Sequence, residues 1–310
     1  MDALVLSFHV VLPLFFMMAL GYFVRCINLV DEKSFKVMNN LVFRVFLPLM
    51  LFSNIYHTHT QIEGKLIAFA VIAVLSLFII LCCMIPLIEK DNRKRGVMIQ
   101  GIMRSNFVIF GLPVAISVFG EENAGVPSMM IAVVIPMFNI LSVLVLELYR
   151  GGRIDFRRII RGLVTNPLII ASVLGLTMMG FHITLPYVAD KTITDLAGIA
   201  TPLALIILGG SIHFDKVKQN LRQLAVTLTG RLVIVPLILV PIAAIMGFRG
   251  VELLSVFIMA GAPTAVSSFT MAEQMEADGE FAGQIVVFGS TFCIITIFLW
   301  IFCLKQIGLI

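Results

Sequence analysis

The stretch Gly111-Leu112-Pro113-Val114-Ala115-Ile116-Ser117-Val118-Phe119 occurs again as Gly261-Ala262-Pro263-Thr264-Ala265-Val266-Ser267-Ser268-Phe269. Both copies follow the pattern Gly-x-Pro-x-Ala-x-Ser-x-Phe inside long apolar segments. Proline lacks a backbone N–H and its ring collides with the carbonyl group one turn earlier, whereas glycine tolerates unusual dihedral angles. Each segment is therefore predicted to be two half-helices joined by irregular backbone.

The composition is that of an integral membrane protein. Of the 310 residues, 60% are hydrophobic and 13% are charged, and the mean hydropathy is +1.06. Because about 20 apolar residues cross a bilayer core of about 30 Å, the chain is predicted to form an all-α protein in the lipid bilayer. Ten transmembrane helices are expected, at residues 4–24, 35–57, 66–88, 96–119, 124–148, 165–181, 191–213, 221–246, 251–275 and 281–304.

Lysine and arginine residues are distributed unevenly among the loops. Fifteen follow the odd-numbered spans, and four lie on the other side of the membrane. Cytoplasmic loops are enriched in these residues, so we expect a multi-pass protein of the cell membrane with both termini outside the cytoplasm. The same distribution explains the net charge of +4, and no nucleic acid partner is expected.

Further matches divide the chain into two related halves. Pro13-Leu14 and Pro48-Leu49 recur as Pro167-Leu168 and Pro202-Leu203 at an offset of 154 residues, and the two proline stretches recur at an offset of 150. Each half holds five spans, an odd number, so the second half is predicted to be inverted relative to the first. The predicted domains are a first repeat over residues 1–148, a basic cytoplasmic linker over 149–162 and a second repeat over 163–310, with spans four and nine as broken crossover helices.

Paired interrupted helices are typical of secondary transporters, in which unwound backbone lines the substrate cavity. The positive ends of half-helices attract anions, so substrate-binding residues are expected around both breaks and in the second span. The predicted set is Arg104, Ser105, Asn106, Gly111, Pro113, Ser117, Gly261, Pro263, Thr264, Ser267, Asn40 and Arg44.

Three arginines, Arg44, Arg104 and Arg231, lie inside predicted spans. Each lies eight or nine residues beyond the last basic residue of its loop, which corresponds to a depth of about 13 Å in a helix. A charge at that depth is costly and indicates function by default. Two interpretations stay open: the arginines face the path of an anionic substrate, or they reach the interface or backbone carbonyls.

Asn106, Glu273 and Gln274 are candidate ligands for a coupling ion, either a proton or sodium. The five cysteines lack the spacing of metal ligands, so neither a metal site nor a cofactor is expected. The chain has no glycine-rich phosphate loop, which argues against pumping driven by ATP. The serines near the breaks have no histidine in their own spans, so the chain is not expected to be an enzyme.

Three groups of residues resemble the auxin efflux carrier family, over essentially the whole chain. They are Arg104-Ser105-Asn106-Phe107 running into Gly111-Leu112-Pro113, Thr165-Asn166-Pro167-Leu168, and Ala262-Pro263-Thr264-Ala265 followed by Ala272-Glu273-Gln274. The short central linker is similar to that of the bacterial branch, whose members are described as malate or malonate permeases. The Asn-Pro-Asn signature of the plant exporters is replaced by Gly111-Leu112-Pro113, so auxin is not the expected substrate.

The resemblance implies a fold similar to that of bile acid/sodium symporters. Spans one, two, six and seven would form a scaffold, and the others a mobile transport domain that carries the crossover and moves like an elevator. The expected function is secondary transport of small organic anions such as malate or malonate. The alternatives are a receptor or sensor of a carboxylate metabolite and a sodium-coupled symporter of a larger organic anion. The sequence leaves open which anion is carried, in which direction, and with which coupling ion. It also leaves open the oligomeric state, for which a homodimer is one candidate.

Overall fold

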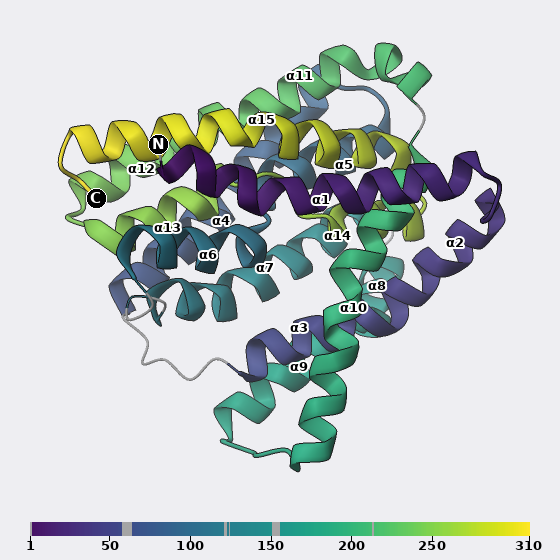
Figure 1. Ribbon diagram of the computed structural model, residues 1–310, viewed down its shortest axis with the longest axis horizontal. Coiled ribbons are helices and arrows are strands. Elements are labelled where there is room, and N and C mark those ends of the chain that lie inside the picture. The colour runs from purple at the N-terminus through teal and green to yellow at the C-terminus, as the bar shows by residue number, and fades with distance from the viewer. Residues whose placement is uncertain (1, 58–63, 121–122, 124, 151–155, 213) are drawn as a thin grey trace.

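The computed structural model describes residues 2–57, 64–120, 123, 125–150, 156–212 and 214–310. Every named element in this part of the chain is helical (Figure 1). The first half contains α1 (Asp2–Cys26), α2 (Glu32–Leu41), the π-helical turn η1 (Val42–Phe46), α3 (Leu47–Tyr56), α4 (Gly64–Ile88), α5 (Asn92–Met103), α6 (Phe107–Phe119) and α7 (Gly125–Tyr149). The second half contains α8 (Phe156–Thr165), α9 (Pro167–Gly180), α10 (Tyr187–Ser211), the 3₁₀ helix η3 (Phe214–Asn220), α11 (Leu221–Thr229), the π-helical turn η4 (Gly230–Ile234), α12 (Val235–Ile245), α13 (Gly250–Gly261), α14 (Ser267–Gln274) and α15 (Gly279–Gln306).

Six helical segments of the described residues are long and apolar enough to cross a membrane. They are Glu32–Tyr56, Gly64–Ile88, Gly125–Tyr149, Tyr187–Ser211, Val217–Ile245 and Gly279–Gln306. Four further apolar segments, Val11–Cys26 (part of α1), Phe107–Phe119, Pro167–Gly180 and Gly250–Gly261, lie close to the intervals of the remaining predicted spans. The all-helical, membrane-embedded class is confirmed, whereas ten crossings and the inversion of the second half stay predictions.

Side-chain caps fix the start of several helices. Asp31 accepts a hydrogen bond from the backbone N–H of Ser34 at the start of α2, and Asp278 accepts one from Phe281 at the start of α15. Asp91 and Asn166 cap α5 and α9 in the same way. Because a cap satisfies an N–H group that lacks an intrahelical partner, these four polar residues define where the apolar helices begin.

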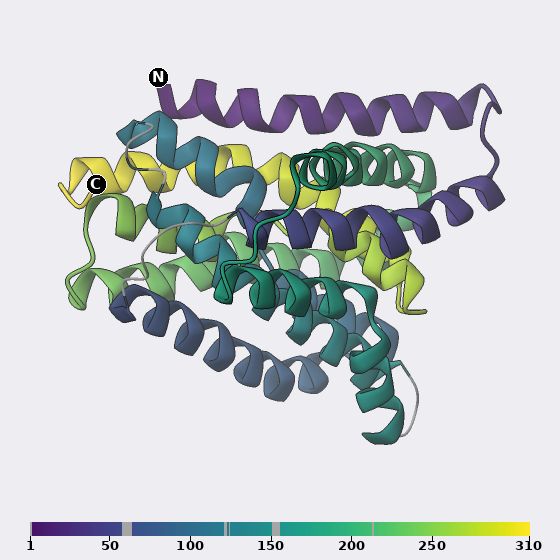
Figure 2. The same ribbon diagram turned by 90° about the horizontal axis from the view of Figure 1, so that it is seen from below.

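More than half of the residues of α5, of α7 and of α13 are buried. On one side α1 packs against α10 and α15, while α3 packs against α9 and α10; Figure 1 shows α1 crossing α10, and Figure 2 shows α1 along one edge. On the outer surface many large apolar side chains are exposed, as at Leu87 and Ile245. An outer surface of this kind is suited to contact with lipid.

The break in the fourth span lies at residues 104–106, between α5 and α6. The predicted break at Gly111 and Pro113 is therefore wrong, because Pro113 lies inside the continuous helix α6. In the ninth span the break covers residues 262–266 and contains Pro263, as predicted. The two broken regions meet through an isolated antiparallel bridge between Ser105 and Thr264, so the residues that oppose each other are not the two matched prolines.

The glycine of each repeated stretch packs against a phenylalanine four residues earlier. In α6 the ring of Phe107 lies over Gly111, where an added Cβ would come within 3.1 Å of the ring. In α13 the ring of Phe257 lies over Gly261, and an added Cβ there would come within 2.7 Å. In both helices the glycine makes room for an aromatic ring one turn earlier, which accounts for the shared Phe-x-x-x-Gly spacing.

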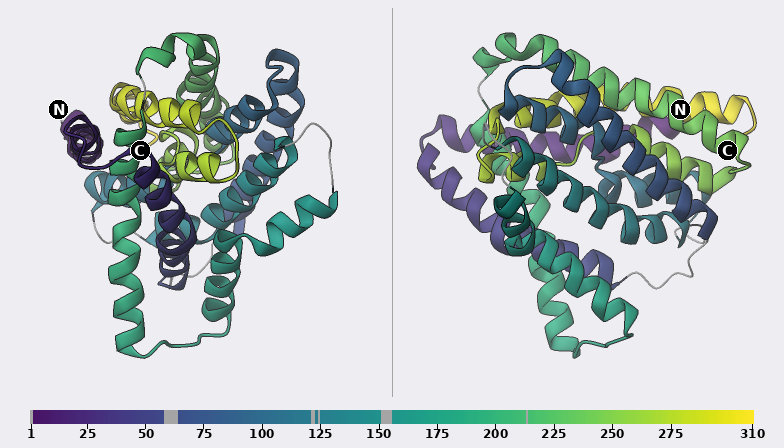
Figure 3. Two further views of the ribbon diagram at one scale, coloured as in Figure 1. Left: turned by 90° about the vertical axis from the view of Figure 1, so that its right-hand side faces the viewer. Right: turned by 180° about the vertical axis from the view of Figure 1, so that it is seen from behind.

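The predicted linker, residues 149–162, is described only in part. Residues 151–155 lie outside the described residues, and residues 156–162 belong to α8. The helix α8 leads into α9 through Asn166, whose extended backbone lets α9 continue at an angle to α8 (Figure 3, left). The described end of this segment is therefore helical, and not only a connecting loop.

Candidate transport site at the crossover

The two broken segments, residues 104–106 and 262–266, meet at a crossover and are joined there by one backbone hydrogen bond and one side-chain hydrogen bond. The N–H of Asn106 donates to the carbonyl oxygen of Pro263 at 2.7 Å. The hydroxyl of Thr264 donates to the carbonyl oxygen of Gly101, also at 2.7 Å. Because unpaired backbone groups are expensive in lipid, these bonds explain how both helices can open at the same place.

Arg231 binds backbone carbonyl groups at the crossover. It lies in the π-helical turn η4 and is 1% exposed. Its guanidinium donates to four carbonyl oxygens, those of Ala262 at 2.7 Å, Met259 at 2.6 Å, Ile102 at 3.1 Å and Met103 at 3.2 Å. These carbonyls belong to the C-terminal ends of α5 and α13, which carry partial negative charge. The sequence left two interpretations of the arginines in predicted spans: contact with the substrate path, or contact with the interface or backbone carbonyls. The hydrogen bonds of Arg231 fit the second interpretation.

Arg104 contacts α14, the helix that follows the break in the ninth span. It is the C-cap residue of α5 and is 4% exposed. Its guanidinium donates to the hydroxyl of Ser267 and to the sulfur of Met271, both at 2.7 Å. No ion pair joins Arg104 to a carboxylate within the described residues. A buried cation without a counter-ion is costly, so this position favours an anion.

A small cavity of about 40 Å³ lies against Arg104. One wall is the crossover, including the first turn of α6 and the start of α14, and the opposite wall comes from α3 and α10. The positive ends of two half-helices therefore border the same space as the guanidinium. The predicted residues Arg104, Ser105, Asn106 and Ser267 line this cavity. Met50 of α3 and Thr201 of α10 also line the cavity, and the sequence did not indicate either residue. The repeated Pro202-Leu203 pair is the one sequence feature next to Thr201 that could have drawn attention to it.

Unsatisfied polar atoms border the same space. The hydroxyl of Ser105 and the amide nitrogen of Asn106 are buried and find no hydrogen-bond partner among the described residues. Buried polar groups are normally paired, and a bound carboxylate oxygen could accept from both. These two atoms add donors to those of Arg104.

The other predicted substrate residues lie away from the cavity. Pro113 and Ser117 are exposed on the outer side of α6. Arg44 is exposed on η1, where neither a hydrogen bond nor an ion pair joins it to another described residue, and Asn40 is half-buried on α2. Gly111 and Gly261 are buried beneath phenylalanine rings, and Pro263 and Thr264 form the crossover backbone.

The candidate ion ligands are not brought together. Asn106 lies at the crossover, whereas Glu273 lines a second cavity of about 350 Å³ at the far end of α14. Gln274, the last residue of α14, is half-buried. Five carboxylate residues, Glu32, Asp91, Glu273, Asp278 and Glu280, line the second cavity together with the cations Lys36 and Arg93. An excess of carboxylates disfavours anions, so the crossover cavity is the better anion site.

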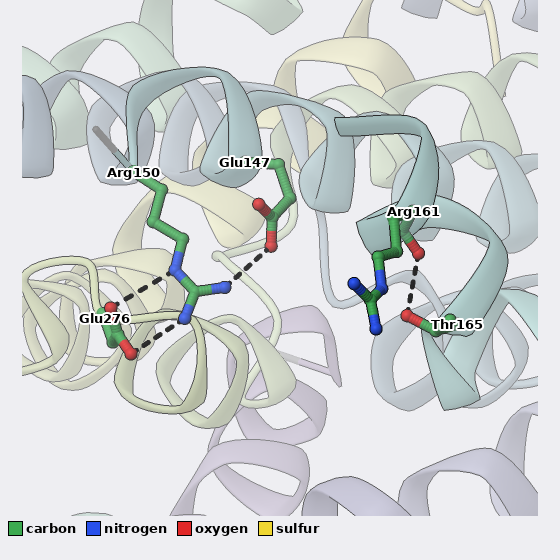
Figure 4. Close-up of polar contacts among 5 residues, drawn as sticks. All are labelled: Glu147, Arg150, Arg161, Thr165 and Glu276. Carbon is green, nitrogen blue, oxygen red and sulfur yellow. Dashed lines mark hydrogen bonds and ion pairs between the residues drawn. The ribbon is translucent and has the colours of Figure 1, made fainter. Parts of the chain in front are cut away.

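A charged contact joins the end of α7 to the turn between α14 and α15 (Figure 4). Arg150 contacts Glu147 at 3.2 Å and Glu276 at 2.8 Å. The hydrogen bond with Glu276 raises the pKa of the Arg150 guanidinium above its ordinary value. The side chain of Glu147 is 5% exposed, whereas that of Glu276 is 72% exposed. Figure 4 also shows Thr165 donating to the carbonyl of Arg161 within α8.

We expect Arg150→Gln to lower the free energy of unfolding by about 1–3 kcal/mol, because the buried Glu147 carboxylate loses its cation. The matched change Glu276→Gln should cost less than about 1 kcal/mol, since that carboxylate is exposed. Denaturant unfolding of the purified proteins in one detergent measures both. Equal losses for the two variants would contradict the role assigned to Glu147.

Comparison with known proteins identifies the family. The model of the membrane transport protein family matches residues 6–301. The chain belongs to this family. The resemblance to auxin efflux carriers is thereby confirmed, because this is the auxin efflux carrier-type family of membrane transport proteins.

Two curated relatives align with this chain along almost their whole length. An uncharacterized transporter of Methanocaldococcus jannaschii is 22% identical over 307 residues, which cover 94% of this chain and 96% of the relative. An uncharacterized transporter of Methanothermobacter thermautotrophicus is 22% identical over 309 residues, with 95% and 97% covered. Family membership supports transport and a carrier that is not an enzyme.

Proposed function

We propose that the protein is a secondary carrier of small organic anions, such as malate, malonate or related carboxylates, across the cell membrane. The observation that carries this proposal is the buried Arg104 guanidinium, which has no carboxylate partner among the described residues and faces the cavity between the crossover and α3 and α10. A carboxylate there would accept hydrogen bonds from Arg104 and lie at the positive ends of α6 and α14.

The size of the cavity supports alternating access. Ligand pockets usually measure about 300–1,000 Å³, whereas this cavity measures about 40 Å³. A dicarboxylate would fit only after the crossover and the wall formed by α3 and α10 separate. We therefore propose an elevator-like displacement, in which α1, the continuous segment α2–η1–α3, α9 and α10 form the scaffold and the crossover moves with the remaining helices.

The order of the helices supports the proposed inverted repeat of ten spans. Each predicted span coincides with one helix or with a pair of consecutive helices, and both crossover breaks occupy the fourth position of their half. The proposed orientation, with both termini outside the cytoplasm, rests on the distribution of Lys and Arg in the loops. Coupling to a proton or sodium belongs to the same proposal, with Asn106 as the candidate ligand at the crossover.

Counterflow in proteoliposomes tests this function. Vesicles loaded with unlabelled malonate are expected to accumulate labelled malonate transiently, and the same assay with and without sodium or a pH gradient identifies the coupling ion. A panel of mono- and dicarboxylates then ranks the substrates. Binding of labelled carboxylate without accumulation would instead indicate a receptor or sensor, and preference for a bulky organic anion with sodium would indicate the symporter alternative.

The two prolines of the repeated stretch make a matched pair for mutation. Pro263→Ala should abolish malonate counterflow while the protein still inserts, because alanine supplies an N–H and lets α13 continue through the crossover. Pro113→Ala should leave counterflow within about twofold of the wild type, because Pro113 is exposed inside a continuous helix and such surface changes are usually small. Equal loss in both variants would contradict the assigned position of the break.

A further inference from the structure

An apolar groove of about 530 Å³ opens on the outer surface between α4 and the segment formed by α11, η4 and α12. Its walls are aliphatic and aromatic apart from the exposed hydroxyl of Ser76 and the backbone of Gly230. Ile102 of α5 contributes to the lining between the two walls. In the view from behind, α4 and the α11–α12 segment lie on the same face of the molecule (Figure 3, right).

One end of the groove is closed by aromatic and polar contacts. The ammonium of Lys65, at the start of α4, donates to the carbonyl oxygen of Met246 at 2.8 Å. The same ammonium lies 5.2 Å from the centre of the Phe248 ring. That ring packs against Phe69, which lines the groove. A chain that enters the groove must therefore enter from the other end or from the side.

The other end of the groove is basic. Arg222 lies one helical turn before Val226, a lining residue, so both share one face of α11. Helical side chains lean toward the N-terminus, which places the guanidinium beyond the apolar wall. Lys90 follows Ile88, the last lining residue of α4, by two positions. Both cations are exposed, and their side chains make no hydrogen bond or ion pair within the described part of the chain.

The carboxylate at this end is already bonded. One oxygen of Glu89 accepts from the backbone N–H groups of Lys90 and Asp91, both at 2.8 Å. The other oxygen accepts from the side-chain amide of Gln223 at 2.8 Å, so this hydrogen bond joins the residue that follows α4 to α11. The basic end therefore presents free cations, whereas its carboxylate is held by neighbouring groups.

We propose that this groove binds one acyl chain of an anionic glycerophospholipid whose phosphate is bound by Arg222 and Lys90. The apolar walls match a hydrocarbon chain, the closed end limits its depth, and the basic end matches the charge of the head group. Loops rich in Lys and Arg face the cytoplasm, so the lipid comes from the inner leaflet, where anionic head groups attract basic residues. The site is separate from the crossover cavity and does not depend on the transported substrate.

Native mass spectrometry of the delipidated full-length protein in detergent tests the proposal. The probes are phosphatidylglycerol and phosphatidylcholine with identical palmitoyl and oleoyl chains. We expect one tightly bound phosphatidylglycerol and at least about fivefold weaker phosphatidylcholine, since one basic residue near a charged lipid surface is worth about 1 kcal/mol. The double variant Arg222→Gln with Lys90→Gln should lose this preference but still bind phosphatidylcholine.

Two bulky changes test the groove itself. Ser76→Trp and Ile238→Trp fill it from opposite walls and should each weaken binding of both lipids, whereas Leu75→Trp, at an exposed position of α4 outside the groove, should not. Melting temperatures of the variants check that they fold. Wild-type lipid binding in both groove variants, or equal affinity for the two lipids in the wild type, would overturn the proposal. So would a dimer that both groove variants disrupt, because the groove would then hold a second copy of the chain.

Discussion

Replacement of Arg231 by methionine is expected to abolish counterflow and to lower the free energy of unfolding by at least about 3 kcal/mol. The reason is that its guanidinium bonds four carbonyl oxygens at the ends of α5 and α13, and each buried acceptor left without a donor costs about 1–3 kcal/mol. Methionine is of similar length and apolar, so the loss measures the hydrogen bonds more than the packing. Denaturant unfolding and counterflow on the same preparation give both quantities.

Two further variants serve as controls for Arg231. Arg231→Lys keeps the charge but not the planar array of donors, so it should recover part of the stability and little of the counterflow. Arg44→Gln removes an arginine at a similar predicted depth that is exposed and makes no hydrogen bond or ion pair with the described residues. It should change stability by less than about 0.5 kcal/mol. Similar losses for Arg44 and Arg231 would show that any charge at this depth is required, and not the contacts of Arg231.

Arg104→Gln should weaken binding of malonate by about tenfold to a hundredfold, because a hydrogen bond to a charged group contributes about 1.5–3 kcal/mol. Binding of the neutral diamide of malonate, where it is detectable, should change far less. Glutamine keeps a donor for Ser267 and a similar length, so the crossover is expected to persist. Isothermal titration of wild type and variant with both compounds measures the difference.

Arg104→Lys separates charge from geometry. A lysine keeps the positive charge but cannot donate two parallel hydrogen bonds to a carboxylate, so it should restore only part of the malonate affinity. Equal loss of affinity for malonate and for the neutral diamide in Arg104→Gln would assign Arg104 a structural role through Ser267 and Met271.

The helix boundaries could be predicted well from the sequence. All ten predicted intervals begin within four residues of a helix start; the largest differences are at 96–119, whose helix begins at Asn92, and at 191–213, whose helix begins at Tyr187. This agreement follows from long apolar runs separated by polar caps such as Asp31 and Asp278, since both signals are local.

The position of the break in the fourth span was wrong for a physical reason. Proline lies inside the helices α1, α4, α6, α7, α10 and α12, so it does not by itself interrupt a helix in this chain. Neighbouring helices can satisfy the groups that a proline frees. The break forms instead at Arg104-Ser105-Asn106, where Pro263 and Thr264 supply backbone partners from the other half of the chain.

The contacts of the three arginines could not be predicted from the sequence either. Their depth could be estimated from residue spacing, but their partners lie far away along the chain. Arg231 bonds to carbonyls of α5 and α13, Arg104 faces a cavity, and Arg44 lies on the surface. Three arginines with the same predicted depth thus lie in three different environments, because tertiary packing decides which face of a helix meets the crossover.

An experimental structure of the wild-type protein with bound malonate would show whether an anion binds at the crossover. We expect a carboxylate within hydrogen-bonding distance of the Arg104 guanidinium and of the first turns of α6 and α14, in a cavity enlarged by movement of the crossover away from α3 and α10. Malonate bound instead in the cavity beside Glu273, or no malonate near Arg104 at a saturating concentration, would contradict it.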